Sequence, residues 1–141
     1  MLKIIYKFFP LIIFISYPIL LVYIFFADKL LCLKIFFVPL FVFLLVTVLR
    51  KIINEQRPYV KYGVSSLFGK NKTGESMPSR HTASAFVIAM AFMRCNVVLG
   101  IIMLVTATLI VLSRILAGVH YIRDVAVGIL ISLVFSVFMF I

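Results

Sequence analysis

Residues 30–49 read LLCLKIFFVPLFVFLLVTVL, a run of 20 residues in which Lys34 is the only charge. At about 1.5 Å of rise per residue, such a helix is about 30 Å long, which is the thickness of the hydrocarbon core of a bilayer. Arg50 and Lys51 follow the run directly, as basic residues commonly do at the end of a membrane span. The stretch therefore predicts a transmembrane helix.

The rest of the chain repeats this pattern. Of its 141 residues, 65% are hydrophobic and the mean hydropathy is +1.28, so the chain cannot hide its apolar surface from water. We expect further helices over residues 4–26, 79–93, 97–113 and 125–141. Lys3 and Lys7 precede the first run as in a signal peptide, but no small-residue cleavage motif follows, and we interpret the run as a membrane helix. The predicted fold is an all-α, multi-pass transmembrane bundle of about five helices, forming one domain over residues 1–141.

Polar residues gather at three places along this chain. They are the long loop of residues 50–78, the start of the helix predicted over 79–93, and the turn between the helices over 97–113 and 125–141. Because each helix crosses the membrane once, the order of the helices places all three segments on the same membrane face. We therefore expect a single site that uses all three.

The third polar segment carries the most specific pattern. It contains Ser113 and Arg114, then five residues, His120, three residues and Asp124. If the last helix begins near Val119, His120 and Asp124 stand at i and i+4 on one face, where the carboxylate can accept a hydrogen bond from the imidazole. That bond would fix the ring tautomer and leave the other nitrogen free to attack an electrophile.

The second segment, residues 77–82, reads MPSRHT. Pro78 and Ser79 are typical of a helix start, where free backbone N–H groups and the positive end of the helix dipole favour an anion. The Ser79 hydroxyl and the Arg80 guanidinium can add donors to that anion. His81 is then placed to give a proton to a leaving oxygen, since an unperturbed imidazole titrates near pH 6.5.

The first segment contains Arg50, Lys51, Arg57 and Pro58. It brings two or three cations to the same face, and Arg57 can hold two phosphate oxygens at once, which a lysine cannot do with comparable geometry. Which of Arg50 and Lys51 contacts the anion is left open by the sequence.

Charge and cysteine content limit the partners. The net charge is +10, from 14 Lys and Arg against 4 Asp and Glu, which indicates an anionic partner. The basic residues lie beside hydrophobic segments, where a lipid phosphate would be found, so nucleic acid is not expected. Cys32 and Cys95 have no ligand-like spacing and predict neither a disulfide framework nor a metal site.

The three segments together resemble the three signature motifs of the type 2 phosphatidic acid phosphatase superfamily, which includes the vanadium haloperoxidases. The family patterns are Lys-x6-Arg-Pro, Pro-Ser-Gly-His and Ser-Arg-x5-His-x3-Asp. The third pattern is matched by Ser113, Arg114, His120 and Asp124. The second is matched by Pro78, Ser79 and His81, with Arg80 in the glycine position. The first is matched by Arg57 and Pro58, with Arg50 in the lysine position and Lys51 one residue out of register. The resemblance covers residues 50–124.

The resemblance implies hydrolysis of a lipid phosphate through a phosphohistidine, without a metal or another cofactor. His120 would attack phosphorus, Asp124 would orient it, and His81 would protonate the leaving oxygen. The implied phosphate-binding residues are Arg50 or Lys51, Arg57, Ser79, Arg80 and Arg114. Candidate substrates include undecaprenyl pyrophosphate, phosphatidylglycerol phosphate and phosphatidic acid.

Two alternatives have different chemistry. A vanadate-dependent haloperoxidase would share the motifs, although those relatives are soluble and larger. A non-catalytic protein that binds anionic lipids would need the cations but not the pair of His120 and Asp124. By resemblance we expect a cell-membrane protein with the site on the extracytoplasmic face, although the positive-inside rule favours the opposite orientation. The oligomeric state is left open.

Overall fold

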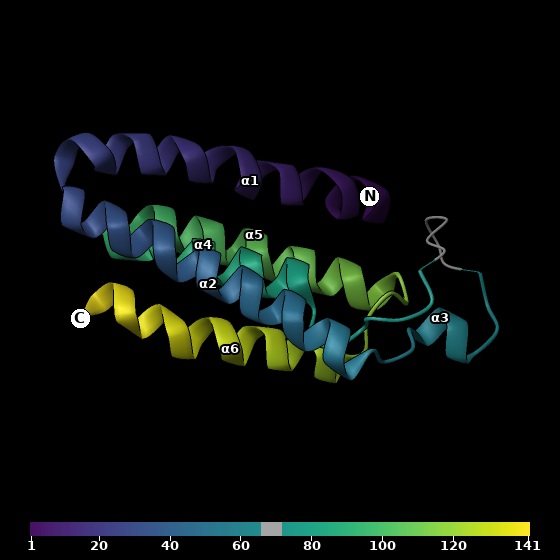
Figure 1. Ribbon diagram of the computed structural model, residues 1–141. Helices are drawn as coiled ribbons and strands as arrows, with labels where there is room; N and C mark the ends of the chain where they lie inside the picture. The colour runs from purple at the N-terminus through teal and green to yellow at the C-terminus, as the bar shows by residue number, and fades with distance from the viewer. Residues whose placement is uncertain (66–71) are drawn as a thin grey trace.

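The computed structural model describes residues 1–65 and 72–141, and these form a bundle of helices (Figure 1). Their bounds are α1 Leu2–Ala27, α2 Lys29–Ile53, α3 Pro58–Lys61, α4 Arg80–Cys95, α5 Val97–Leu116 and α6 Ile122–Phe140. The predicted all-α fold is confirmed, with five long helices and the short α3 among the described residues. The last helix begins at Ile122, three residues before the expected start at residue 125. It also begins after Val119, so the condition that placed His120 and Asp124 on one helical face is not met.

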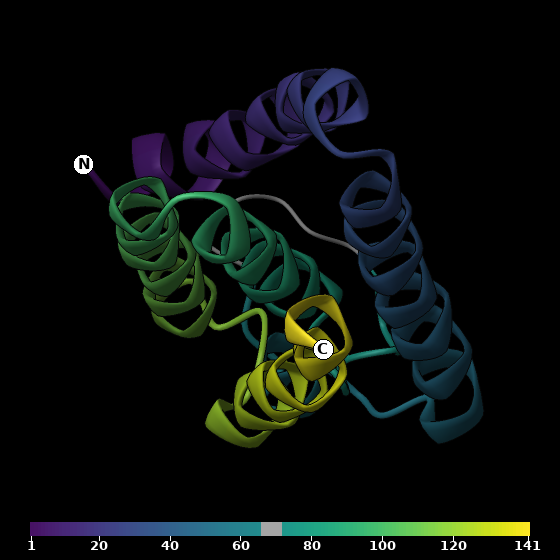
Figure 2. The same ribbon diagram turned by 90° about the vertical axis from the view of Figure 1, so that its left-hand side faces the viewer.

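Four of the described helices, α1, α2, α5 and α6, are long and apolar enough to cross a membrane. The fifth, α4, has 16 residues and packs against all four others. Seen along the bundle, α4 lies in the middle (Figure 2). Every residue from Thr82 to Ala89 is buried, and alanines at 83, 85 and 89 let the neighbouring helices approach closely.

Two single-residue junctions close one end of the bundle. Asp28 separates α1 from α2, and Asn96 separates α4 from α5. In each, the side-chain oxygen accepts a hydrogen bond from the backbone N–H three residues later, at 3.0 Å from Leu31 and 3.1 Å from Leu99. These are ordinary N-caps, and they let consecutive helices reverse direction without a loop.

The longer connections therefore gather at the opposite end, together with the N-terminus (Figure 1). The predicted loop of residues 50–78 starts later, because α2 continues to Ile53, and it contains α3. Its residues 66–71 lie outside the described part of the chain. The turn from α5 to α6 passes through Gly118 at φ 66°, a conformation that glycine adopts without strain.

The start of α6 is fastened to the start of α4. The Ser79 N–H donates to the Asp124 carbonyl at 2.9 Å, and the Ser132 hydroxyl donates to the Ala83 carbonyl at 2.7 Å. A Cβ at Gly128 would lie 3.0 Å from the Ser79 carbonyl oxygen, so the absence of a side chain there permits the close approach. The second and third polar segments are thus held side by side.

Candidate active site

A pocket of about 170 Å³ lies at the loop end of the bundle. It is lined by Tyr6, Arg50, Arg57, Lys72, Arg80, His81, Arg114, Val119 and His120. All three polar segments contribute to it, as the order of the helices predicted. Four arginines, one lysine and two histidines in so small a space favour an anion of more than one negative charge.

His120 lies in the turn that precedes α6 and is only 4% exposed. Its Nδ1 is 3.5 Å from Oδ2 of Asp124, which is wholly buried and also accepts the Tyr121 N–H at 3.0 Å. The two side chains meet although His120 is not helical, because the turn folds back onto the first residues of α6. Nδ1 faces the carboxylate, so Nε2 is the ring nitrogen that remains for another partner.

Ser76 completes this buried group. Its hydroxyl donates to Oδ2 of Asp124 and lies 3.5 Å from Nδ1 of His120. Ser76 is not among the predicted site residues, and no local sequence pattern marks it, because its partners are 44 and 48 residues away along the chain.

Burial lowers the pKa of His120 below its ordinary value of 6.5. The hydrogen bond to Asp124 acts in the opposite direction and is the weaker of the two effects. The ring is therefore neutral at neutral pH, which is the protonation state that a nucleophilic imidazole needs.

Arg50 and Arg57 are held by backbone carbonyls of the loop. Arg50 Nη2 donates to the Glu75 carbonyl at 2.6 Å, and Arg57 Nε donates to the Gly74 carbonyl at 3.2 Å. The Glu75 carboxylate turns instead to Lys72 Nζ at 2.7 Å, and this hydrogen bond lowers the pKa of Glu75. Carbonyl oxygens position a guanidinium without neutralising it, so both arginines keep their charge for a ligand.

Arg114 and Arg80 lie over aromatic rings. The Arg114 guanidinium carbon is 3.9 Å from the centre of the Tyr6 ring, and Nη2 is 3.4 Å from the Tyr6 carbonyl oxygen. The Arg80 guanidinium carbon is 5.3 Å from the centre of the Phe43 ring. Such contacts orient the cation while leaving its charge uncompensated.

Most of the predicted site residues meet at this pocket. Those in the lining are Arg50, Arg57, Arg80, His81, Arg114 and His120, with Asp124 directly behind His120. Lys51 is exposed and lies outside the lining, so Arg50 is the cation that the end of α2 contributes.

Ser79, which the sequence predicts to bind the anion, does not line the pocket. It is fully buried and outside the lining; its Oγ accepts from the Thr82 hydroxyl at 2.9 Å, and its N–H is bonded to the Asp124 carbonyl. Ser79 therefore joins α4 to the His120 segment.

Tyr6, Lys72 and Val119 also line the pocket, although no sequence motif predicts them there. Helix order offered a signal for Tyr6, since the first helix begins on the face that carries the three polar segments. Lys72 belongs to the polar loop, but nothing in its neighbours marks it as a pocket residue.

A metal site needs several ligating side chains close together. Within residues 1–65 and 72–141, there is no cluster of three His, Cys, Asp or Glu side chains that could hold a metal ion. What the pocket can do chemically is bind a multiply charged oxyanion and present it to a neutral imidazole.

Comparisons with known proteins agree with this arrangement. The model of the PAP2 superfamily matches residues 31–141. The crystal structure of Aquifex aeolicus LpxE superposes with a TM-score of 0.81 at 27% identity, over 99% of this chain and 85% of that one. No curated protein matches the chain.

A second solved structure shows the fold alone. It is the first transmembrane PAP2 type phosphatidylglycerolphosphate phosphatase from Bacillus subtilis, with a TM-score of 0.54 at 19% identity over 94% of both chains. Together with the four long apolar helices, the match shows a multi-pass membrane protein. Because the family model covers most of the chain, including every residue of the three motifs, the chain belongs to the PAP2 superfamily.

Proposed function

We propose that this protein is a membrane lipid phosphatase that removes a phosphate group from a lipid phosphate or pyrophosphate through a phosphohistidine at His120. The observation that carries the proposal is the pocket of about 170 Å³ in which four arginines surround two histidines. Membership of the PAP2 superfamily and the likeness to LpxE support a phosphatase that works in a membrane.

The first step forms a bond between His120 Nε2 and phosphorus and breaks the bond from phosphorus to the lipid oxygen. His81, which lines the same pocket, gives a proton to that departing oxygen. The negative charge of the bound phosphate lets His81 hold that proton, because it offsets burial and the surrounding arginines, which both disfavour a protonated imidazole. In the second step, water attacks the phosphohistidine and gives a proton to His81, and the bond between phosphorus and His120 breaks. Inorganic phosphate leaves and both histidines return to their starting states.

Arg50, Arg57, Arg80 and Arg114 hold the phosphate oxygens during both steps. Phosphoryl transfer is catalysed mainly by positioning and by stabilising oxygen charge, so arginines fixed in advance by carbonyls and rings favour the transition state. Three of these arginines, at 50, 57 and 114, are at most 6% exposed, and their charge is screened little by water.

The pair of His120 and Asp124 favours an enzyme over a protein that only binds anionic lipids. An anion-binding site gains nothing from a wholly buried carboxylate behind the imidazole, which partly offsets the positive charge of the pocket. A nucleophile does gain, because the carboxylate fixes the ring and stabilises positive charge that develops on it.

A lipid substrate is favoured because the pocket residues lie at the ends of helices that are long and apolar enough to cross a membrane, where a phosphate headgroup would be found. Undecaprenyl pyrophosphate, phosphatidylglycerol phosphate and phosphatidic acid all present such a group. We place the site on the extracytoplasmic face of the cell membrane, and we propose that neither a metal nor another cofactor takes part.

The test is phosphate release from these lipids by the detergent-purified protein in excess chelator. We expect release by the wild type and by Lys61→Ala, which removes an exposed basic residue outside the pocket lining, and none by His120→Ala. Trapping a radiolabelled phosphoryl group on acid-labile, base-stable protein would support the phosphohistidine. Full activity of His120→Ala would refute the mechanism, and activity that disappears with chelator would refute its independence of metal.

A further inference from the structure

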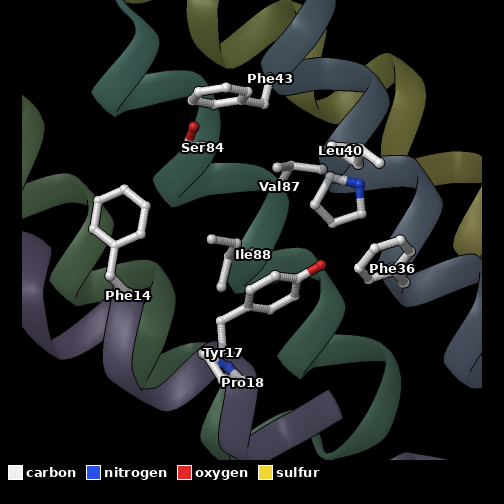
Figure 3. Close-up of a pocket in the computed structure, with 10 residues that line it drawn as sticks. Phe14, Tyr17, Pro18, Phe36, Leu40, Phe43, Ser84, Val87 and Ile88 are labelled. Carbon is white, nitrogen blue, oxygen red and sulfur yellow. The ribbon is translucent and has the colours of Figure 1, made fainter.

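A second pocket, of about 290 Å³, lies within the membrane-spanning part of the bundle, between α1, α2 and α4. Its walls are almost wholly apolar and include Phe14 from α1, Phe36 and Phe43 from α2, and Val87 and Ile88 from α4 (Figure 3). A hollow of this kind accepts a hydrocarbon chain at no cost in desolvated polar groups.

This apolar pocket lies next to the phosphate pocket at one end. Phe43 lines it, and the guanidinium of Arg80, which lines the phosphate pocket, lies 5.3 Å from the centre of the Phe43 ring. If the phosphate of a ligand lies beside Arg80, the rest of the ligand is therefore close to the Phe43 side of the apolar pocket.

The apolar pocket also continues in the other direction. Phe36 lines both this pocket and a hollow of about 540 Å³ between α1 and α2, which Phe25 and Cys32 also line. From Phe43 to Cys32 the path follows α2 for about 16 Å at 1.5 Å per residue, roughly half the hydrocarbon thickness of a bilayer. The length and direction fit one chain of a lipid that lies along the bundle.

One polar group interrupts this apolar lining. Ser84 lines the pocket at 6% exposure, and its hydroxyl has no hydrogen-bond partner among the described residues. A buried hydroxyl without a partner is unfavourable in the free protein, and an acceptor on a ligand would satisfy it. Ser84 follows Arg80 by four residues on α4, which places it about 6 Å, one helical turn, deeper than Arg80 on the same helix face.

Given the proposed function, we propose that the apolar pocket binds an acyl chain of the substrate and that the Ser84 hydroxyl donates a hydrogen bond to the ester carbonyl joining that chain to the headgroup. An ester-linked lipid phosphate carries a carbonyl a few bonds from its phosphate. A polyprenyl phosphate carries only hydrocarbon at that depth and leaves the hydroxyl unsatisfied. The substrate class is therefore an acylated lipid phosphate rather than a polyprenyl one.

The test compares kcat/KM for diacyl phosphatidic acid and for its dialkyl ether analogue of the same chain length, which lacks the carbonyl. We expect the wild type to prefer the ester by about 3- to 10-fold, the range of one neutral hydrogen bond, and Ser84→Ala to lose this preference. Thr108→Ala is the matched control, because it removes an exposed helical hydroxyl that is bonded to the Leu104 carbonyl, away from the pocket. It should keep the preference.

A second variant tests the chain itself. Leu40 lines the pocket from the exposed side of α2, and Leu40→Trp should narrow the pocket while leaving the packed interior intact. The ratio of kcat/KM for dioleoyl over dibutyryl phosphatidic acid should fall in this variant.

The outcomes separate the inference from the function on which it rests. Equal use of ester and ether by the wild type, an ester preference that survives in Ser84→Ala, or faster hydrolysis of a polyprenyl phosphate would overturn the inference while leaving a lipid phosphatase in place. Failure of the wild type to release phosphate from every lipid would instead refute the proposed function, and the inference with it.

Discussion

His120, Asp124 and Ser76 are connected so closely that each should affect the protonation of the others. The carboxylate accepts from the Ser76 hydroxyl and from the Tyr121 N–H, and its contact with Nδ1 raises the pKa of His120 against the stronger lowering by burial. Two opposed effects therefore determine the pKa of His120: loss of water lowers it, and the neighbouring Asp124 carboxylate raises it.

The first prediction concerns the pH dependence of kcat/KM. In the proposed mechanism the neutral form of His120 attacks. Its pKa lies below 6.5, so activity should persist at neutral pH and fall as the pH drops through that lowered pKa. Asp124→Asn removes the charge that raises this pKa, so the acid limb should move to lower pH while kcat falls by about 100-fold or more. A pH–rate profile measures both, and an acid limb that moves to higher pH would contradict the assignment.

The second prediction concerns Ser76. Ser76→Ala should lower kcat by about 10-fold, because one hydrogen bond to the charged Asp124 is lost and the imidazole is less firmly oriented. Ser65→Ala, in the exposed part of the same loop, is the control and should match the wild type. An unchanged kcat in Ser76→Ala would mean that backbone contacts alone orient Asp124.

The third prediction separates two adjacent cations. Arg50 is 4% exposed and lines the phosphate pocket, whereas Lys51 is exposed and outside the lining. Arg50→Lys should reduce kcat/KM by about 10- to 100-fold. A lysine keeps the charge, but it cannot donate to the Glu75 carbonyl and to a phosphate with the planar geometry of a guanidinium. Lys51→Ala should change it by less than about 3-fold. Reversed magnitudes would restore Lys51 as the residue that binds the phosphate.

At the scale of single elements, α4 determines how the site is assembled. It is surrounded by the other four long helices, and its first turn carries both Arg80 and His81 into the phosphate pocket. A helix in this position needs small residues toward its neighbours more than it needs length or high hydropathy. That is why α4 is the shortest of the long helices and still belongs to the bundle.

The fourth prediction concerns the turn from α4 to α5. A Cβ at Gly100 would lie 2.3 Å from Cα of Met93, which is backbone and cannot rotate away. Gly100→Ala should therefore lower the free energy of unfolding by about 1–3 kcal/mol, as overpacked positions do. Thermal unfolding in detergent measures this, with the exposed neighbour Val98→Ala as the control. A variant as stable as the wild type would show that the turn can relax.

At the scale of the whole molecule, five long helices and two tight junctions place the ends of the bundle on opposite sides of the membrane. Lys61 lies at the loop end with the phosphate pocket, and Lys29 lies beside the junction at Asp28. The charge of the loop end does not fix its side, because basic residues that bind a phosphate do not act only as topological signals.

The fifth prediction concerns this orientation. In a variant with Cys32 and Cys95 replaced by alanine, a membrane-impermeant maleimide added to intact cells should label Lys61→Cys and not Lys29→Cys. Permeabilised cells should show labelling at both positions, which controls for reactivity. Labelling of Lys29→Cys alone would place the phosphate pocket on the cytoplasmic face, and labelling of both in intact cells would contradict the number of crossings.

The sequence by itself determined the membrane helices, because the length and composition of each apolar run are local properties, and these properties decide whether the run is stable in a bilayer. It also predicted that the three polar segments share one end of the bundle, since helix order fixes parity, and that His81, His120 and Asp124 lie close together, as the structure shows. The types of these residues and their spacing in the sequence indicate the chemistry without any knowledge of how the helices pack.

Only the tertiary structure decided which neighbouring groups complete the site. The choice of Arg50 over Lys51 depends on the rotation of α2 against α4, and the burial of Ser79 depends on how closely Gly128 lets α6 approach. Ser76 and Tyr6 meet their partners through contacts between segments that are 44 and 108 residues apart. Such contacts depend on how helices pack in three dimensions, and no local pattern of residues records that packing.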